Sequence, residues 1–378
     1  MEVGLAMTAQ ATPEPTTAST TTPATAPSTA HATAREAPLF AVYGATGHTG
    51  RVVTAELLAR RQHVILSGRD ERALHAVATE LATPDLVSVR HTPLDDPPAL
   101  RALAEAADVV IHCAGPFTTT GEPVATAAAE TGTAYVDHAI EPHHVKYLFD
   151  SLQATAQRTG AVLVPQMSFY GGLGDLLAAA AAAGLPDADK VTVGYAVTGW
   201  RMTQGAMNTA NLLIGEIDRI GFVDGAQRVG PVEIRNAVFP FPPPVGPRTT
   251  IVPFPSGEVV TVPRHVPARA VEVQLTAATF EEEQIFSSVD VSPQERAKTE
   301  FTVAVQVTGA AGGGRNAHVR GRDIWRAGAV VSVEAALRLA GGEGPAKTGV
   351  LAPAEAFAAP EFLRALAESG TFALTLPG

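Results

Sequence analysis

The fold is decided by one stretch, Leu39-Phe40-Ala41-Val42-Tyr43-Gly44-Ala45-Thr46-Gly47-His48-Thr49-Gly50-Arg51-Val52-Val53. An apolar run typical of a buried strand stops at Gly44, and a helical pattern begins three residues later. Glycine at 44 permits a sharp turn, glycine at 47 lets backbone N–H groups approach a pyrophosphate, and glycine at 50 lets the helix pack closely on the strand. The stretch predicts the strand, turn and helix N-terminus that bind a dinucleotide, and a glycine turn that binds nothing is the alternative.

Composition limits the classes of protein to which the chain can belong. It has 378 residues, 46% of them hydrophobic and 17% charged, which is enough for a large core and two domains. The net charge of −11 and the lack of a Lys/Arg run disfavour nucleic acid and anionic membranes as partners, so a small-molecule substrate is expected. The single cysteine, Cys113, cannot form an internal disulfide, which fits a cytoplasmic protein.

The chain is expected to divide into four parts. Residues 1–36 are rich in Thr, Ala and Pro and are predicted to form a disordered tail that is not a signal peptide. Residues 37–167 are predicted to form the nucleotide domain, residues 168–325 a substrate and dimerisation domain, and residues 326–378 C-terminal helices. No segment reaches the roughly 20 apolar residues of a membrane span.

Alternating apolar patterns predict an α/β fold with a Rossmann-type parallel sheet. Strands are expected at 39–43, 63–66, 86–89, 109–113, 134–137 and 161–164, the last being the final strand of the sheet, with helices at 52–59, 72–81, 98–106, 123–130 and 142–159. The second, mixed α/β domain has strand-like alternations at 191–197 and 301–307, which predict an antiparallel sheet interrupted by a helix at 206–220. Helices are expected at 330–339, returning to the nucleotide domain, and at 360–368.

The second strand ends in Ser67-Gly68-Arg69, where an NAD-specific domain would carry an acidic side chain. Arg69 suits the 2′-phosphate of NADP, although a solvated arginine paired with Asp70 or Glu71 is the alternative. Asp95 either flanks the adenine or caps the next helix. The residues predicted to bind NADP are Gly44, Ala45, Thr46, Gly47, His48, Thr49, Gly50, Ser67, Arg69, Asp95, Ala114, Gly115 and Pro116.

The motifs at 44–51, 67–69, 114–117 and 135–137 together resemble those of the saccharopine dehydrogenase-like NADP-binding proteins, which include saccharopine reductases and trans-acting enoyl reductases. The similarity is specific over about residues 38 to 150 and looser at 256–265 and 349–353. It implies an NADPH-dependent reductase that is usually a dimer. His48 stands where an apolar residue is usual, and Ala139-Ile140-Glu141 replaces a Gly-Glu pair. Residues 168–172 lack the amino-acid-binding signature, so saccharopine is not the expected substrate.

The proton donor is the hardest part of the site to identify. Tyr170, Tyr135 and Glu141 are the candidate catalytic residues because they follow predicted strand ends, and Asp137, His143 and His144 lie nearby in the sequence. The alternatives are that Asp137 caps the next segment, that the histidines are solvated, and that Tyr170 packs in a domain interface. Arg201, Arg264 and His265 are the basic residues expected to meet a substrate carboxylate or carbonyl, or else are surface charges.

The predicted function is NADPH-dependent reduction of a C=C, C=N or C=O bond. The apolar stretch at 239–245 favours a medium-sized apolar metabolite. A sensor or scaffold that binds NADP without turnover is the alternative, because a fold does not determine a function. No metal is expected, since the histidines lack ligand spacing and Cys113 has no partner cysteine. No Gly-x-Ser-x-Gly motif is present, so a hydrolase is not expected.

Overall fold

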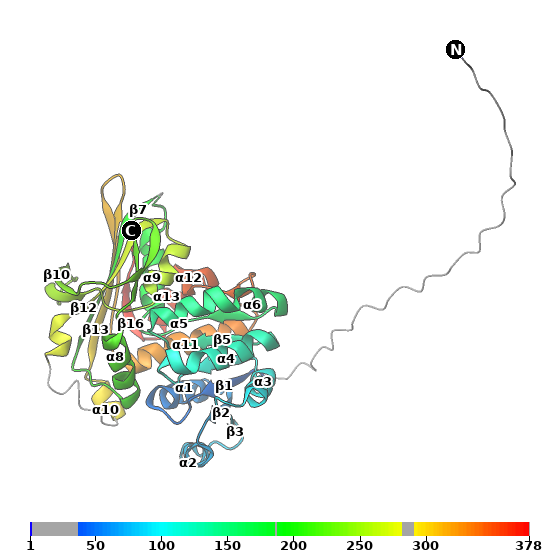
Figure 1. Ribbon diagram of the computed structural model, residues 1–378. Helices are drawn as coiled ribbons and strands as arrows, with labels where there is room; N and C mark the ends of the chain where they lie inside the picture. The colour runs from blue at the N-terminus through cyan, green and yellow to red at the C-terminus, as the bar shows by residue number, and fades with distance from the viewer. Residues whose placement is uncertain (2–36, 186, 282–290, 378) are drawn as a thin grey trace. The chain divides into compact units, whose positions relative to one another are not determined.

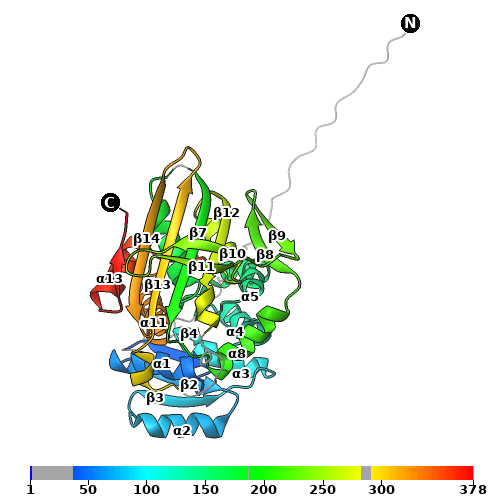
Figure 2. The same ribbon diagram turned by 90° about the vertical axis from the view of Figure 1, so that its left-hand side faces the viewer.

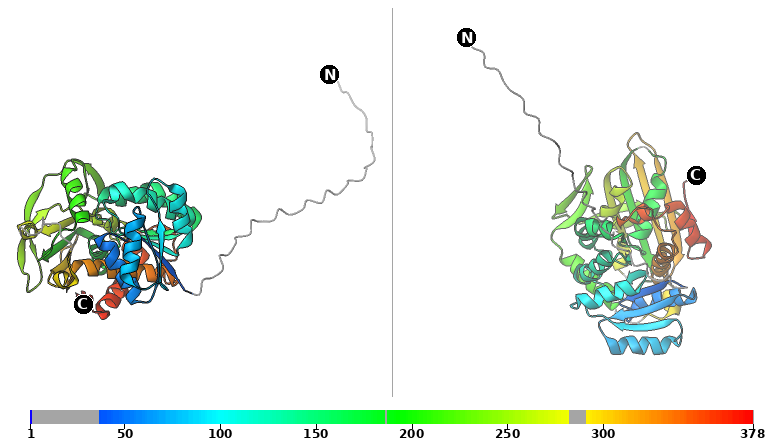
Figure 3. Two further views of the ribbon diagram at one scale, coloured as in Figure 1. Left: turned by 90° about the horizontal axis from the view of Figure 1, so that it is seen from below. Right: turned by 90° about the vertical axis from the view of Figure 1, so that its right-hand side faces the viewer.

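The computed structural model describes residue 1 and residues 37–185, 187–281 and 291–377. The predicted tail at 1–36 therefore lies, apart from Met1, outside the described residues. From Ala37 onward the chain forms one unit that contains two sheets. Figure 1 shows the N-terminal part of the first sheet, with its helices, in blue and cyan, and Figure 2 shows the long strands of the second sheet above it. Figure 3 gives two further views of the same ribbon.

The first sheet has seven parallel strands in the order β15-β6-β5-β4-β1-β2-β3. This confirms the predicted Rossmann-type sheet. The strands are β1 (Leu39–Tyr43), β2 (His63–Gly68), β3 (Val87–His91), β4 (Val109–His112), β5 (Ala134–Asp137), β6 (Val162–Val164) and β15 (Gly349–Val350). The prediction that residues 161–164 end the sheet is wrong, because β15 pairs beyond β6. A strand of two residues carries too little pattern to be predicted.

Helices connect these strands and cover the sheet. They are α1 (His48–Ala59), α2 (Glu71–Leu81), α3 (Pro97–Ala106), α4 (Phe117–Thr131), α5 (Pro142–Tyr147) and α6 (Gln153–Thr159), with a π-helical turn at Leu148–Leu152 between α5 and α6. The Asp70 side chain caps α2, and the Asp96 side chain caps α3. Asp95 therefore does not cap α3, which removes one of its two predicted roles.

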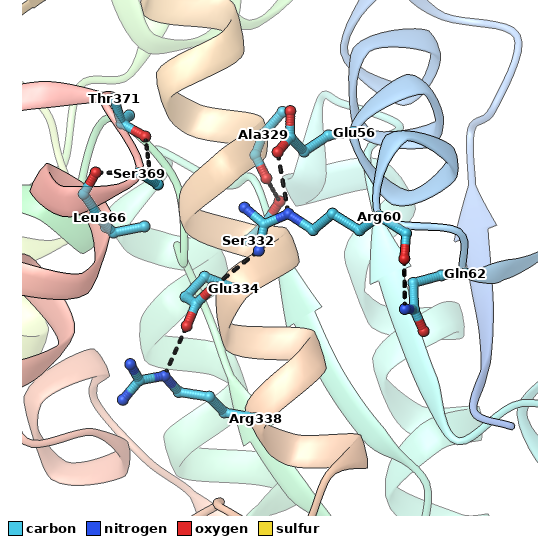
Figure 4. A network of polar contacts seen from close by, with 10 residues as sticks. All are labelled: Glu56, Arg60, Gln62, Ala329, Ser332, Glu334, Arg338, Leu366, Ser369 and Thr371. Carbon is cyan, nitrogen blue, oxygen red and sulfur yellow. Dashed lines mark hydrogen bonds and ion pairs between the residues drawn. The ribbon is translucent and has the colours of Figure 1, made fainter.

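A long helix from the C-terminal part of the chain packs on the first sheet. Helix α11 (Ile324–Ala340) contacts α1, β4 and β5. Figure 4 shows the polar side of this contact, where Arg60, which directly follows α1, pairs with Glu334 of α11 at 2.9 Å. The N-terminal residues of α11 thereby lie beside the carboxyl ends of the central strands.

The second sheet is mixed. Its order is β10-β11-β12-β7-β13-β14-β16, and a hairpin of β8 and β9 joins it at β12. These strands are β7 (Ala188–Thr198), β8 (Arg219–Val223), β9 (Ala226–Gly230), β10 (Arg235–Pro240), β11 (Pro247–Val252), β12 (Ala268–Thr276), β13 (Glu300–Gly309), β14 (Gly314–Arg322) and β16 (Phe372–Thr375). The predicted antiparallel sheet is wrong at its centre, because β7 and β12 pair in parallel.

The helices of this half are mostly short. Those of four residues are α9 (Glu258–Thr261), α10 (Pro293–Arg296) and α12 (Pro353–Ala356), and the longer ones are α7 (Gly172–Ala182), α8 (Gln204–Gly215) and α13 (Ala359–Glu368). Short 3-10 turns lie at Val262–Arg264 and Ala277–Phe280. The helix predicted at 206–220 is too long, since α8 ends at Gly215 and β8 begins at Arg219. None of the helices described is long and apolar enough to cross a membrane.

Candidate active site

A cavity of about 1240 Å³ begins at the carboxyl ends of the first sheet and extends along the second. Its nucleotide end is lined by the glycine turn, Arg69 and residues 114–117. Its other end is lined by residues of α8, by Trp200, Met202 and Trp325, and by apolar side chains of the second sheet. The strand ends of a doubly wound sheet are where such folds bind ligands.

Two hydrogen bonds hold the glycine turn against β2. The N–H groups of Gly44 and Ala45 both donate to the Ser67 carbonyl, at 2.8 and 3.1 Å. Gly44 has φ +85°, which favours glycine, and Gly47 immediately precedes α1 without a side-chain cap. The first N–H groups of α1 are consequently left to meet a ligand, at the positive end of the helix.

The turn leaves no space for side chains at two of its glycines. A Cβ atom on Gly50 would lie 2.2 Å from the Gly44 carbonyl oxygen, and one on Gly44 would lie 2.7 Å from Cβ of Ala114. A Cβ atom on Gly47 would meet nothing closer than 3.4 Å. The first two glycines are required by packing of the protein on itself, whereas Gly47 leaves the cavity side of the turn open.

The predicted cofactor residues fall into two groups. Those that line the cavity are Gly44, Thr46, Gly47, His48, Thr49, Arg69, Ala114, Gly115 and Pro116. Ala45, Gly50, Ser67 and Asp95 do not line it. Ser67 instead supports the turn through its carbonyl, and its hydroxyl donates to Thr92 Oγ1 at 2.9 Å. Asp95 is exposed.

Arg69 is exposed at the edge of the cavity, and its backbone carbonyl contacts His91 Nε2 at 3.1 Å. Asp70, which the sequence offered as a partner for Arg69, accepts instead from the Ala73 N–H of α2. Within the described ranges no salt bridge engages the Arg69 guanidinium. It is therefore available to an anionic group in the cavity.

Tyr135 does not line the cavity, contrary to what a catalytic role requires. Its side chain is fully buried, with the hydroxyl donating to Asp137 Oδ2 at 3.0 Å and lying 3.1 Å from His112 Nδ1. Asp137 also contacts His144 Nε2 at 2.9 Å and accepts from the Ala139 N–H. The alternative of a solvated side chain does not hold for His144, which is buried in this network.

Glu141 and Tyr170 contribute to the cavity wall, but their polar atoms are occupied or covered. Glu141 is fully buried, and its two carboxylate oxygens accept from the N–H groups of Phe117 and Ile140, at 2.7 and 3.0 Å. Burial raises the pKa of this carboxyl above its usual value. The Tyr170 hydroxyl is buried with no hydrogen-bond partner in the described part of the chain, and burial raises its pKa.

A polar cluster that the sequence analysis missed stands at the same strand ends. His138 follows β5 directly, Ser168 follows β6, and both line the cavity. Ser168 Oγ lies 2.8 Å from His138 Nδ1, and Ser332 Oγ of α11 lies 2.8 Å from His138 Nε2. The strand-end rule that drew attention to residues 135–137 and 168–172 also marked these two positions, but it does not say which neighbouring side chain faces the ligand.

Residues 40–166 match the family model described as the saccharopine dehydrogenase NADP binding domain. This part of the chain is an NADP-binding domain of the saccharopine dehydrogenase type. Curated relatives match it too: a putative trans-acting enoyl reductase of Mycobacterium tuberculosis is 34% identical over 132 residues, which are 34% of this chain and 31% of that protein. A saccharopine dehydrogenase-like oxidoreductase of Bos taurus is 30% identical over 143 residues, which are 34% of this chain and 33% of that protein. The chain thus matches about a third of the length of these relatives.

A solved structure extends the likeness of fold beyond the NADP-binding domain. Saccharopine dehydrogenase (L-Glu forming) from Saccharomyces cerevisiae superimposes with a TM-score of 0.61, covering 89% of this chain and 99% of that one at 12% identity. At this identity the match shows the fold, including the second sheet, and carries no statement about the substrate.

The NADP-binding domain has the features that its cofactor requires. Gly50 lets α1 pack against the glycine turn, and Gly44 lets the turn pack against Ala114. The start of α1 has N–H groups to offer, and Arg69 is available to a phosphate. These residues fit the pyrophosphate and the 2′-phosphate of NADP.

The three basic residues expected to meet the substrate, Arg201, Arg264 and His265, do not line the cavity. Arg264 pairs with Glu355 at 3.1 Å and stacks on the Phe149 ring, and His265 Nε2 contacts Asp175 Oδ2 at 2.9 Å. Among the residues that the structure describes, the arginines of the lining are Arg69 and Arg219. The same residues include no cluster of His, Cys, Asp and Glu able to hold a metal ion.

Proposed function

We propose that this chain is an NADPH-dependent oxidoreductase that reduces a C=C, C=N or C=O bond of a medium-sized apolar metabolite. One observation carries the proposal: a single cavity joins the site of the NADP-binding domain to an apolar chamber between α8 and the second sheet. A redox enzyme needs both parts in one space, because the nicotinamide and the substrate carbon must meet.

The chamber favours a neutral substrate. Its walls include Met202, Leu213, Phe254, Leu275 and Phe280, and Arg219 is its one arginine among the described residues. A binding site for an amino acid would need to pair a carboxylate and an ammonium group, since unpaired charges are costly to bury. The total volume, about 1240 Å³, exceeds the 300–1,000 Å³ of typical small-molecule sites and leaves room for a substrate beside a dinucleotide.

The residues have distinct proposed roles. The start of α1 and the glycine turn bind the pyrophosphate, Arg69 binds the 2′-phosphate, and Ala114, Gly115 and Pro116 border the nicotinamide at the end of β4. When bound, NADPH supplies a hydride to the substrate carbon. Of the predicted proton donors, Tyr135 is left out of the proposal because it lies outside the cavity. Tyr170 and Glu141 are proposed to shape the cavity wall.

The names of the relatives support a reductase but do not agree on a substrate or a place in the cell. The match from Mycobacterium tuberculosis is named a putative trans-acting enoyl reductase, and one from Caenorhabditis elegans a lipid droplet localized protein. A cytoplasmic homodimer remains our proposal for this chain. Light scattering coupled to gel filtration tests the dimer, and a mass of one chain would contradict it.

The test of the function is consumption of NADPH with a panel of neutral acceptors that contain a conjugated C=C bond, a ketone or an imine. The expected result is steady oxidation of NADPH with at least one class, and a much smaller rate with NADH. Tight NADPH binding without consumption by any acceptor would instead support the sensor or scaffold alternative.

A further inference from the structure

His138 is held between two serine hydroxyls that come from different elements. Its Nδ1 lies 2.8 Å from Ser168 Oγ, and its Nε2 lies 2.8 Å from Ser332 Oγ. Ser332 is on α11, and Figure 4 shows its hydroxyl bonded to the Ala329 carbonyl one turn earlier, at 3.0 Å. The imidazole is thus held at Nε2 by α11, which packs on the first sheet, and at Nδ1 by the segment between β6 and α7.

The hydrogen bonds around His138 decide which ring nitrogen carries the proton. The Ser332 hydroxyl has one proton, and it is donated to the Ala329 carbonyl, so Ser332 Oγ accepts from Nε2–H of His138. A neutral imidazole protonated at Nε2 has a lone pair at Nδ1, which accepts the Ser168 hydroxyl proton. The opposite tautomer would require the Ser332 hydroxyl to donate to Nε2 and would lose its bond to the Ala329 carbonyl. Burial lowers the pKa of His138 to about 4, against the opposing charge of Asp137, so the resting ring is neutral.

The cluster opens onto the cavity. His138 and Ser168 line it, while Ser332 lies behind them. Gly328 of α11 also lines it, and a Cβ atom there would stand 2.9 Å from Ser168 Oγ. The absence of a side chain at Gly328 leaves room for the Ser168 hydroxyl. Of the three donors predicted from sequence, Tyr135 lies outside the cavity, the Glu141 carboxylate is occupied by two backbone N–H groups, and the Tyr170 hydroxyl is covered. The Ser168 hydroxyl lines the cavity and is bonded to a side chain that can itself take up and release a proton.

We propose that Ser168 and His138 are the proton-exchange pair of the redox reaction, with Ser168 as the catalytic residue that touches the substrate and Ser332 as a positioning residue that fixes the tautomer. This inference rests on the proposed function. It identifies the acid and base that the nucleotide-binding residues do not supply.

The proton balance is the same in both directions. In reduction, the substrate carbon gains a hydride from NADPH, which becomes NADP⁺. The electron pair of the double bond moves to the atom at the other end of the bond or conjugated system. That atom takes the Ser168 proton. Ser168 then regains a proton from solvent through Nδ1 of His138, which is neutral at rest and doubly protonated only while it passes that proton on. In oxidation the proton moves from substrate to Ser168 to neutral His138. Nε2 stays protonated throughout, so its bond to Ser332 need not change.

The arrangement is tested without turnover by nitrogen NMR of the full chain labelled with ¹⁵N-histidine. The sequence has 11 histidines, and loss of one signal set in His138→Asn assigns His138. The expected wild-type ring is protonated at Nε2 and not at Nδ1. Ser332→Ala should mix the tautomers, whereas Ser168→Ala should move only the Nδ1 resonance. A wild-type ring protonated at Nδ1 would overturn the proposal.

Ser369→Ala is the matched control. The Ser369 hydroxyl also donates to a carbonyl three residues earlier, that of Leu366, at 2.7 Å, and Figure 4 shows both serines. Ser369 lies outside the cavity, so this variant should leave the His138 signals unchanged.

Kinetics separate this inference from the proposed function. With an acceptor that the wild-type chain reduces, Ser168→Ala should keep NADPH affinity within about twofold and lower turnover at least about tenfold, equal to about 1.4 kcal/mol of barrier. The solvent deuterium isotope effect on turnover should increase. If the wild-type chain reduces no acceptor, the proposed function fails. If it reduces one and Ser168→Ala retains the rate, the proton-exchange pair alone is wrong.

Discussion

Gly50 packs so closely on Gly44 that a Cβ atom at position 50 would lie 2.2 Å from the Gly44 carbonyl oxygen. The contact joins the first turn of α1 to the residue that directly follows β1. Because the obstructing atom belongs to the backbone, it cannot move aside as a flexible side chain would. This contact fixes the position of α1 against the glycine turn. The proposed pyrophosphate site therefore depends on it.

Gly50→Ala should destabilise the protein, since overpacking of this kind typically costs about 1–3 kcal/mol. Denaturant unfolding measures the loss. Gly47→Ala is the control, because Gly47 has φ −75° and its Cβ atom would meet nothing closer than 3.4 Å. The control should fold normally and bind NADPH more weakly. Equal stability of the two variants would contradict the packing argument.

Arg69→Asp should weaken NADPH binding by roughly 2 kcal/mol or more, because a charge-assisted hydrogen bond is worth about 1.5–3 kcal/mol. NADH, which lacks the 2′-phosphate, should lose much less affinity. Calorimetric titration with both nucleotides measures the difference. Arg72→Asp makes the same charge change at an exposed position of α2 outside the cavity and should affect the two nucleotides alike. An equal loss for both nucleotides in Arg69→Asp would show that Arg69 does not bind the 2′-phosphate.

Tyr170→Phe should stabilise the protein, by about 1 kcal/mol, and leave turnover within about threefold. The reason is that its buried hydroxyl has no partner among the described residues, and an unsatisfied buried group costs about 1–3 kcal/mol. Tyr195→Phe is the matched control, because the Tyr195 hydroxyl donates to Glu258 at 2.5 Å and accepts from the Gly171 N–H. Tyr195→Phe should destabilise the protein. A tenfold loss of turnover in Tyr170→Phe would restore the tyrosine as proton donor.

The ion pair of His265 and Asp175 should make stability depend on pH. Burial alone would lower the pKa of His265, but the Asp175 carboxylate outweighs it, so the folded pKa is raised above 6.5. The stabilisation is therefore complete below the unfolded pKa of about 6.5 and is lost as pH rises through the higher folded pKa. The melting temperature of the wild type should exceed that of His265→Asn most near pH 5.5 to 6 and least at alkaline pH. A difference that grows with pH would contradict this account.

Much of the first sheet could be predicted because its signals are local. Apolar runs alternate with helical patterns, and the glycine turn marks the join between β1 and α1. Strand β15 could not be predicted, because its two residues depend on the return of the C-terminal part of the chain to β6. The parallel pairing of β7 with β12 was also missed, because an alternating pattern reports which face is buried and not the direction of the neighbouring strand.

The site shows the same limit at the level of single side chains. The strand-end rule indicated the segments after β5 and β6, where the cavity does lie. Within the second segment, Gly171 has φ +83° and Met167 bridges to it, and this tight turn places Ser168 at the cavity while covering the Tyr170 hydroxyl. The sequence shows that a glycine turn follows, but it does not show which side chain the turn presents.

Transfer of deuterium from NADPH labelled at C4 of the nicotinamide tests the central claim most directly. The wild-type chain is incubated with each labelled C4 epimer of NADPH and a neutral unsaturated acceptor, and the product is analysed by mass spectrometry. The account predicts one deuterium in the product from one epimer and none from the other, because the cavity presents a single face of the ring to the substrate. Tightly bound NADPH that transfers deuterium to no acceptor would contradict it.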